Sequence, residues 1–203
     1  MIVGLTGGIA CGKSTISAYL KTQGIPVIDG DVVARQIVEV GSEGLAQIIA
    51  AFGSEYLNED GSLNRAMLGR TVFANKDALN RLNGITKPLL LQAFQEQIAA
   101  YNNHPMVVLD MALLLEDSDY LALVDEVWLV TVSPEEQLDR LMHRNGYDID
   151  EAKNRIASQM SDELRKPYAN VVIDNSGTIR ETLAQVERVL YNRLVNDNIT
   201  IES

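Results

Sequence analysis

The stretch Met1–Thr15, MIVGLTGGIACGKST, constrains the fold of this chain more than any other feature. Its residues 2–6 are apolar or β-branched and predict a buried strand, and 14–21 predict an amphipathic helix. Between them, residues 7–14 match G-x-x-x-x-G-K-[ST] at every fixed position. A strand, this loop and a helix in succession predict a phosphate-binding loop, or P-loop.

The residue types in the loop suit a polyphosphate. The glycines at 7, 8 and 12 have no Cβ, so the backbone can curl and point its N–H groups at phosphate oxygens. The following helix adds further free N–H groups and the positive end of its dipole. The Lys13 ammonium can bridge β- and γ-phosphate oxygens, and the Ser14 hydroxyl can ligate Mg²⁺. We therefore interpret the loop as a nucleotide-binding site.

Size, charge and cysteine content limit the class of protein. A length of 203 residues with 46% hydrophobic content suits one α/β domain with insertions. A formal net charge of −11, without a block rich in Lys and Arg, argues against nucleic acid as a partner. The single cysteine, Cys11, suits a reducing compartment, and the early P-loop leaves no room for a signal peptide. No apolar run approaches the ~20 residues of a membrane span. We expect a cytoplasmic protein with no membrane partner.

Short apolar segments that alternate with helical patterns predict the architecture. Besides 2–6, strands are expected at 26–28, 106–109, 127–132 and 171–173. Helical patterns occupy 32–40, 45–52, 63–103 with Ser62 as its N-cap, 134–165 with a break at 145–146, and 180–195, before a polar tail at 196–203 that is expected to fray. This alternation predicts a three-layer α/β fold with a parallel five-stranded sheet. In such sheets the site forms at the carboxyl ends of the strands.

Carboxylates follow two of the predicted strands at that edge. Asp31 comes just after the strand at 26–28 and could be a general base that accepts the proton of an attacking alcohol. Its alternative role is to cap the helix expected from Val32. Asp29 is the less favoured base, and a contact with Mg²⁺ is its alternative role. Asp110 ends the strand at 106–109, where a carboxylate commonly holds Mg²⁺ directly or through water. A helix cap or a strand-end polar residue is the alternative for Asp110.

Three arginines are candidates for contacts with anions. Arg140 and Arg144 project from one face of a predicted helix, where an arginine can stabilise the charge on a transferred phosphoryl group. The alternative is a solvated face on which Glu136 pairs with Arg140. The break at 145–146 suits a lid that closes. Arg65 lies at the beginning of the helical pattern at 63–103 and could contact an anionic substrate, although a surface arginine is the more common case.

Six segments, in the same order, resemble the dephospho-CoA kinase family, which has a nucleoside-kinase-like P-loop fold. The resemblance covers most of the chain. Its segments are LTGGIACGKST, the D-x-D-x-x-A-R stretch at 29–35, Gly61–Phe73, 110–116, the lid positions Gln137, Arg140, Arg144, Arg155, Ile156 and Gln159, and Val172–Gly177.

The resemblance implies an activity and a division of the chain. ATP, with Mg²⁺, would phosphorylate the 3′-hydroxyl of dephospho-CoA in the last step of coenzyme A biosynthesis. The implied parts are a nucleotide-binding core at 1–34, 104–133 and 167–203, a helical CoA-binding insertion at 35–103, and a lid at 134–166.

The resemblance also implies roles for individual residues. The catalytic residues would be Asp31 as the base, with Lys13 and Arg140 on the phosphates. The metal ligands would be Ser14 and Asp110. The ATP-binding residues would be Gly8, Ile9, Ala10, Cys11, Gly12, Lys13, Ser14, Thr15 and Arg144, and the acceptor-binding residues would be Asp31, Arg65, Lys87 and Asp110.

The sequence departs from the family pattern at several positions. Ala10 replaces a glycine of the loop, which alanine tolerates if its φ angle is negative. Lys87 stands where a histidine is expected, and Ala112 where a proline is expected; 168–170 replaces an Ala-Asp pair. Lys87 could supply a positive charge to a phosphate of CoA.

Other functions remain open from the residues. One is a P-loop kinase that acts on a nucleoside, a nucleotide or another metabolite. A GTP-dependent switch is a second, but the chain has no N-K-x-D guanine motif. A third is a non-catalytic paralogue that binds nucleotide or CoA precursors without turnover. The sequence does not specify the oligomeric state.

Overall fold

The computed structural model describes residues 1–196, and it describes side chains as far as residue 193. The chain divides into two compact units, one made of Met1–Ile28 and Tyr101–Ser203 and the other of Asp29–Ala100. The predicted polar tail lies outside the described residues from 197 onward. The functional division into core, insertion and lid stays a prediction.

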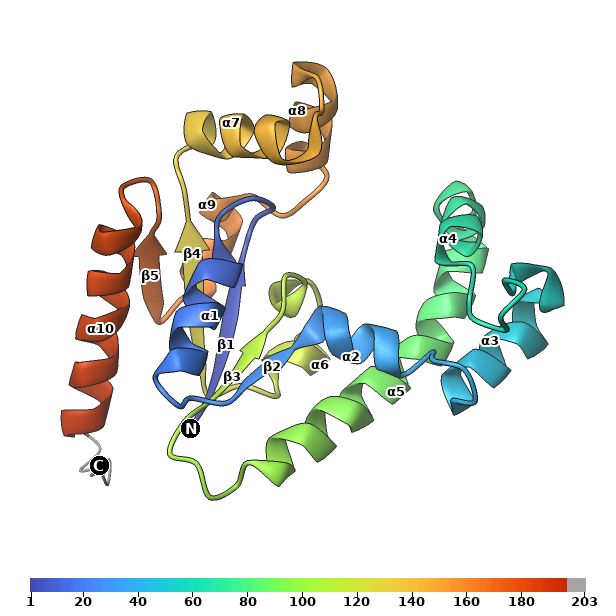
Figure 1. Cartoon of the computed structure of the whole chain (residues 1–203), viewed down its shortest axis with the longest axis horizontal. Coiled ribbons are helices and arrows are strands. Elements are labelled where there is room, and N and C mark those ends of the chain that lie inside the picture. The colour runs from blue at the N-terminus through green and yellow to red at the C-terminus, as the bar shows by residue number, and fades with distance from the viewer. Residues whose placement is uncertain (197–203) are drawn as a thin grey trace. The chain divides into compact units, whose positions relative to one another are not determined.

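A five-stranded sheet in the order β2-β3-β1-β4-β5 organises the first unit (Figure 1). The strands are β1 (Ile2–Gly7), β2 (Val27–Asp29), β3 (Val107–Asp110), β4 (Glu126–Thr131) and β5 (Val171–Asp174). The pairs of β1 with β3, β1 with β4, and β4 with β5 are parallel. The predicted parallel sheet is confirmed. Its register aligns Leu5 with Asp110 and Gly7 with Val130, so Asp110 ends its strand beside the start of the P-loop.

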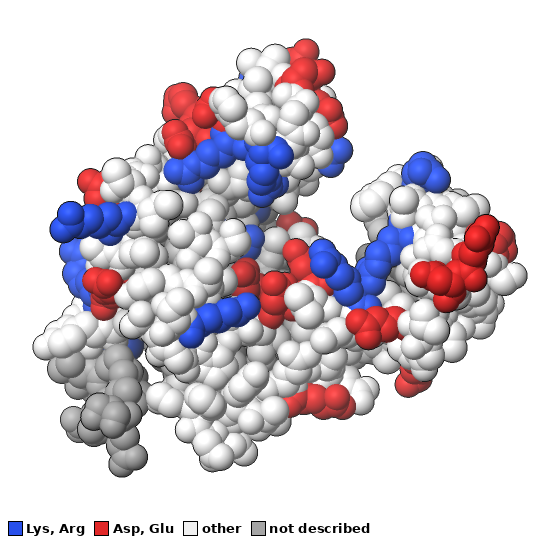
Figure 2. Space-filling model, in the orientation of Figure 1, with Lys and Arg blue, Asp and Glu red and all other residues white. Residues whose placement is uncertain are grey.

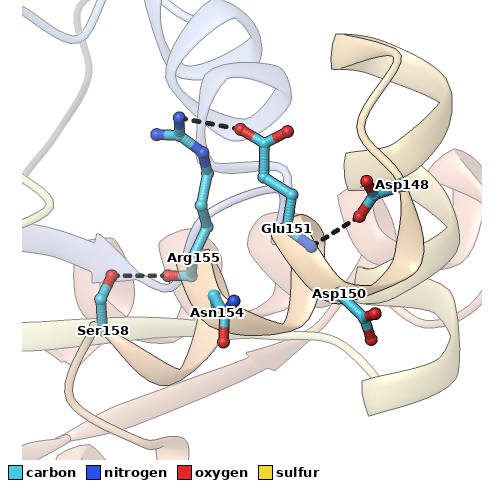
Figure 3. Close-up of a pocket in the computed structure, with 6 residues that line it drawn as sticks. All are labelled: Asp148, Asp150, Glu151, Asn154, Arg155 and Ser158. Atoms are coloured by element: carbon cyan, nitrogen blue, oxygen red, sulfur yellow. Dashed lines mark hydrogen bonds and ion pairs between the residues drawn. The ribbon is translucent and has the colours of Figure 1, made fainter.

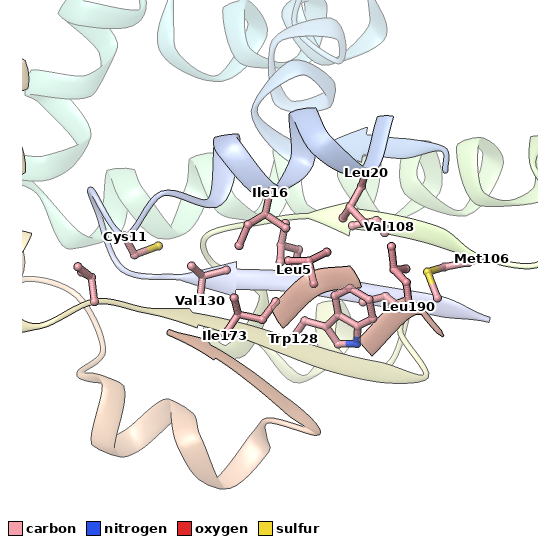
Figure 4. Close-up of a cluster of buried hydrophobic side chains, with 13 residues drawn as sticks. Leu5, Cys11, Ile16, Leu20, Met106, Val108, Trp128, Val130, Ile173 and Leu190 are labelled. Carbon is pink, nitrogen blue, oxygen red and sulfur yellow. The ribbon is translucent and has the colours of Figure 1, made fainter. Parts of the chain in front are cut away.

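Helices α1 (Lys13–Thr22) and α10 (Ile179–Asn196) share one hydrophobic cluster with the sheet (Figure 4). Ile16 and Leu20 of α1, Val186 of α10 and Trp128 of β4 are all fully buried or nearly so. Burying each large side chain of this kind contributes roughly 1.5–3 kcal/mol. The cluster therefore anchors the helix that follows the P-loop against the central strands.

On β1, Gly4 makes room for a neighbouring segment. A Cβ at this position would collide with the side chain of Leu114, which belongs to the short helix η2 (Leu114–Glu116). The remaining helices of this unit are α6 (Ser118–Leu121), α7 (Pro134–Asn145), α8 (Ile149–Ala157), α9 (Asp162–Arg165) and η3 (Lys166–Tyr168). The predicted break at 145–146 is confirmed, because Gly146 ends α7 in the left-handed region with a φ of 69°.

The second unit is helical after the end of β2. It contains α2 (Gly30–Gln36), α3 (Glu43–Phe52), η1 (Ser54–Tyr56), α4 (Arg65–Ala74) and α5 (Lys76–Ala100). Val38, Ile48, Leu68 and Val72 form its buried core. Residues 63–103 are all described and contain no named strand, as expected.

Two expectations about helix boundaries in this unit are wrong. Ser62 does not cap the helix, because its backbone N–H and its hydroxyl both donate to Asp60 in a tight turn. Asn64 caps α4 instead, its side-chain oxygen accepting from the Met67 N–H at 2.9 Å. The helix expected at 32–40 begins at Gly30 and ends at Gln36.

Among residues 1–196, the structure has no helix that combines the length and the apolar character needed to cross a membrane.

Candidate functional site

The P-loop joins β1 to α1 through a tight backbone turn. The Cys11 N–H donates to the Gly8 carbonyl at 3.2 Å, and the Thr15 N–H donates to the Gly12 carbonyl at 3.1 Å. Gly12 is the N-cap of α1, with a φ of 92°, and no side chain caps the helix there. The first N–H groups of α1 therefore have no side-chain cap at the place where a phosphate would bind.

Ala10 adopts a conformation that the sequence analysis did not anticipate. Its φ is 60°, and it is the one described residue other than glycine with a positive φ. The condition under which alanine would be tolerated without strain, a negative φ, is therefore not met, because the loop curls through a left-handed conformation at this point. An alanine in this region costs roughly 1–2 kcal/mol relative to its preferred conformation. Contacts around the loop must offset that strain.

One such contact comes from Asn175, which follows β5 and is 5% exposed. Its side-chain Nδ2 donates to the Cys11 carbonyl at 2.8 Å, and its Oδ1 accepts from the Thr182 hydroxyl at 2.7 Å. A Cβ on Gly12 would collide with the Asn175 amide, so glycine is needed there for close approach as well as for its φ. Asn175 was not among the predicted site residues.

Arg140 lies at the same place, where its structural alternative is observed and its phosphate-binding role stays a prediction. Its Nε pairs with Glu136 Oε1 at 2.8 Å, as in the structural alternative. Its Nη2 also donates to the Asn175 carbonyl at 2.9 Å, and its Nη1 lies 3.8 Å from where a Gly12 Cβ would be. The guanidinium therefore stands next to the P-loop with its orientation set by two acceptors. Arg144 instead donates to its neighbour Asn145 at 2.8 Å, at the end of α7.

A second arginine beside the loop was missed by the sequence analysis. Arg165 is 3% exposed and pairs with Asp162 at 3.1 Å. Its Nη1 lies 3.1 Å from where a Cβ on Gly8 would be. Figure 2 shows that basic side chains over α7 and α8 gather mainly on the side nearer the sheet, while acidic side chains lie mainly on the outer side. A positive field beside the P-loop favours a polyphosphate.

Asp110 and Ser14 supply oxygen atoms of the type that Mg²⁺ prefers. Asp110 ends β3 next to β1, and its Oδ2 accepts from the Ser17 hydroxyl of α1 at 2.5 Å. Ser17 thereby fixes the carboxylate relative to the helix that carries the exposed hydroxyl of Ser14. Within the described residues, no group of three or more His, Cys, Asp or Glu side chains could hold a metal ion. A hydroxyl with a single carboxylate fits an ion whose remaining ligands are phosphate oxygens and water.

Cys11 is buried at 1% exposure within the loop. Burial raises the pKa of its thiol above the ordinary value, despite the nearby Lys13 ammonium, which lowers it. The thiol is therefore neutral at physiological pH and unsuited to act as a nucleophile.

In the second unit, Asp29 and Asp31 have different structural roles. The Asp29 carboxylate caps α2 by accepting from the Asp31 N–H at 2.9 Å and from the Val32 N–H at 3.1 Å. The capping role considered for Asp31 thus belongs to Asp29, because α2 begins earlier than expected. Asp31 lies in the first turn of α2 and is exposed.

Two arginines lie together in the second unit. Arg65 begins α4 and donates from Nη2 to the Arg35 carbonyl at 3.1 Å. Burial and the positive charge of Arg35 lower the pKa of Arg65 below its ordinary value, while Glu39 opposes this. The guanidinium remains charged at neutral pH. Lys87, the second predicted acceptor-binding cation, lies in the middle of α5 and is half-buried.

A shallow surface hollow on α8 lies outside these groups of residues (Figure 3). It is lined by Asp148, Asp150, Glu151, Asn154, Arg155 and Ser158. Asp148 caps α8, and Arg155 pairs with Glu151 at 3.2 Å. These contacts stabilise the helix itself.

Known proteins resemble this chain along most of its length. A family model for dephospho-CoA kinase matches residues 1–181. The dephospho-CoA kinase of Shouchella clausii is 46% identical over 188 residues, which cover 92% of this chain and 95% of that protein.

Two solved structures share the fold at high coverage. TT1252 from Thermus thermophilus has a TM-score of 0.80 and 30% identity, covering 95% of this chain and 97% of that one. The dephospho-CoA kinase from Campylobacter jejuni has a TM-score of 0.73 and 26% identity, covering 94% of this chain and 96% of that one. The complete P-loop, its arginines and these matches agree: the chain belongs to the dephospho-CoA kinase family.

Proposed function

We propose that this protein transfers the γ-phosphoryl group of ATP to the 3′-hydroxyl of dephospho-CoA, forming CoA and ADP in the last step of coenzyme A biosynthesis. The observation that carries the proposal is the P-loop geometry, with Arg140 beside Gly12 and Asp110 in register with β1. Family membership supports the acceptor. The enzyme would work in the cytoplasm on small molecules, without nucleic acid or a membrane.

The chemical step requires a base for the acceptor alcohol and cations for the phosphates. We assign the base to Asp31, whose carboxylate would take the proton as the 3′-oxygen forms a bond to the γ-phosphorus. The bond from that phosphorus to the bridging oxygen of ADP breaks in the same displacement. Lys13 and Arg140 would stabilise the charge on the transferred group, and Arg144 would contact ATP from the lid.

Mg²⁺ would be held by the Ser14 hydroxyl and the Asp110 carboxylate, which Ser17 already orients. The ion would neutralise charge on the β- and γ-phosphate oxygens. ATP would lie along the loop from Gly8 to Thr15, where the free N–H groups of α1 point at its phosphates.

The acceptor would bind through the helical second unit. The Arg65 guanidinium, which binds the Arg35 carbonyl and feels the positive charge of Arg35, would provide a positive site suited to the phosphates of dephospho-CoA. Lys87 would add a further charge, and Asp110 and Asp31 would contact the acceptor near the reacting hydroxyl. Closure of the segment 134–166 would exclude water that otherwise hydrolyses ATP.

The test is ADP release with Mg-ATP in the presence of dephospho-CoA, adenosine, cytidine monophosphate or shikimate. We expect turnover with dephospho-CoA and a loss of roughly 10²–10⁴ in kcat for Asp31→Asn, because the amide cannot accept the proton. Turnover with a different acceptor alone would reject the substrate assignment. ATP binding without any turnover would indicate a non-catalytic paralogue, and strong selectivity for GTP would indicate a switch.

Asp29→Asn is the matched control for Asp31→Asn. Asparagine caps helices as well as aspartate does, so α2 keeps its cap. We expect Asp29→Asn to retain most of the activity. Loss of turnover in Asp29→Asn with activity retained in Asp31→Asn would exchange the two assignments.

A further inference from the structure

Both hydrogen-bonding groups of the Ile9 backbone are bound by glutamine side chains from outside the P-loop. The Ile9 N–H donates to Gln159 Oε1 at 2.7 Å, and Gln137 Nε2 donates to the Ile9 carbonyl at 2.8 Å. Gln137 belongs to α7, and Gln159 follows the end of α8. One residue of the loop is thus held from both sides by the segment predicted to be the lid.

The two amides use opposite halves of the same functional group. A glutamine amide offers both a donor and an acceptor, and here one residue uses its N–H and the other uses its oxygen. Holding each long side chain in one rotamer costs conformational entropy. Two such side chains ordered on a single residue indicate a position where the backbone needs support.

The place they hold is next to the strained part of the loop. Ile9 directly precedes Ala10, whose φ is 60°. Beside it, a Cβ on Gly8 would lie 2.8 Å from Gln137 Nε2 and 3.8 Å from Gln159 Oε1. The glutamines therefore lie directly over the Gly8 backbone while they bind both polar groups of the Ile9 backbone.

We propose that Gln137 and Gln159 are positioning residues that hold the P-loop in its phosphate-binding conformation and couple it to the segment 134–166. They act through the Ile9 backbone rather than by touching phosphate. The proposal rests on the proposed function only in that ATP is the nucleotide bound. Both glutamines bind the Ile9 backbone, so loss of either hydrogen bond makes this backbone more mobile and weakens the remaining one.

The primary experiment measures binding of a non-hydrolysable ATP analogue by calorimetry, with Mg²⁺ and without acceptor. Gln137→Leu and Gln159→Leu keep similar size but cannot form the hydrogen bonds. We expect the Kd for nucleotide to rise about fivefold in each variant, which is the typical net value of one hydrogen bond. The double variant should lose less than the product of the two single losses, because the effects are coupled. Gln23→Leu, at the other end of α1, is the control and should bind like wild type.

A matched pair of charge variants separates the hydrogen bonds from packing. Gln137→Glu and Gln159→Glu add the same charge beside Gly8, but only glutamate at 159 can still accept from the Ile9 N–H. Glutamate at 137 cannot donate to the Ile9 carbonyl. We expect Gln137→Glu to bind the analogue at least about fivefold more weakly than Gln159→Glu. This comparison remains informative if the leucine variants fail to fold.

Steady-state kinetics provide the second measurement. The variants should raise the KM for ATP while the KM for dephospho-CoA stays unchanged, a division that a general loss of stability would not produce.

Equal Kd values for the two glutamate variants, or wild-type Kd values for both leucine variants, would overturn the proposal. Failure of the wild type to phosphorylate dephospho-CoA would reject the proposed function alone, since nucleotide binding is measured without acceptor.

Discussion

Replacing Asn175 with alanine tests how the P-loop is held in the fold. The Asn175 side chain is buried and joins three parts of the first unit. It donates to the Cys11 carbonyl at 2.8 Å, and it accepts from the Thr182 hydroxyl of α10 at 2.7 Å. The Arg140 guanidinium binds the backbone carbonyl of Asn175, so that contact survives the substitution. Only the two side-chain bonds are lost.

The magnitude follows from what each partner can do afterwards. The Thr182 hydroxyl still has the Thr178 carbonyl at 3.3 Å, so its loss is small. The Cys11 carbonyl loses its amide partner inside a buried site, which costs roughly 1–3 kcal/mol. The cavity left by the amide group adds to this. We expect the free energy of unfolding to fall by about 2–3 kcal/mol and Tm to fall by roughly 4–12 °C, at 2–4 °C per kcal/mol for a chain of this size.

Urea unfolding and calorimetry measure the effect, with nucleotide affinity as a second readout. Asn154→Ala, on the exposed surface of α8, is the control and should unfold within about 0.5 kcal/mol of wild type. Asn175→Asp keeps an oxygen for Thr182 but cannot donate to Cys11, so it should also be destabilised and should bind ATP more weakly. An Asn175→Ala variant as stable as wild type would refute the reasoning, because the Cys11 carbonyl would then not depend on this amide.

Two further predictions concern the loop itself. Ala10→Gly should raise the free energy of unfolding by about 0.5–1 kcal/mol, because relief of the left-handed strain at φ 60° exceeds the added entropy of the unfolded glycine; a decrease in urea unfolding would contradict strain at this residue. Burial raises the pKa of the Cys11 thiol above its unfolded value of 9.0, because the folded protein disfavours the thiolate. The contribution of the neutral thiol to the free energy of unfolding is therefore fully present below pH 9.0 and is lost as pH rises from 9.0 to the folded pKa. Stability measured against pH should therefore decline less steeply above pH 9.0 in Cys11→Ala than in wild type, and identical slopes would argue against the raised pKa.

The sequence alone determined the elements whose signals are local. Each apolar run predicted a strand that the structure contains, and the P-loop motif predicted the turn between β1 and α1. The break at 145–146 followed from a glycine that ends α7. Such features depend on neighbours within a few residues, so periodicity and turn chemistry reveal them. Cap assignment failed at Ser62 because a nearby aspartate competes for the same hydroxyl, which pattern alone does not resolve.

Only the tertiary structure decided what surrounds the P-loop. Gln137, Gln159, Arg165 and Asn175 lie more than 120 residues along the chain from the loop residues they approach, and the contacts of Gln159 and Asn175 span 150 and 164 residues. An amide in a polar stretch has no local signal that distinguishes a buried partner from a solvated one. The positive φ of Ala10 likewise contradicts the local preference of alanine. Distant side chains bind the backbone on either side of this residue, at Ile9 and at Cys11, and their packing follows from the fold as a whole.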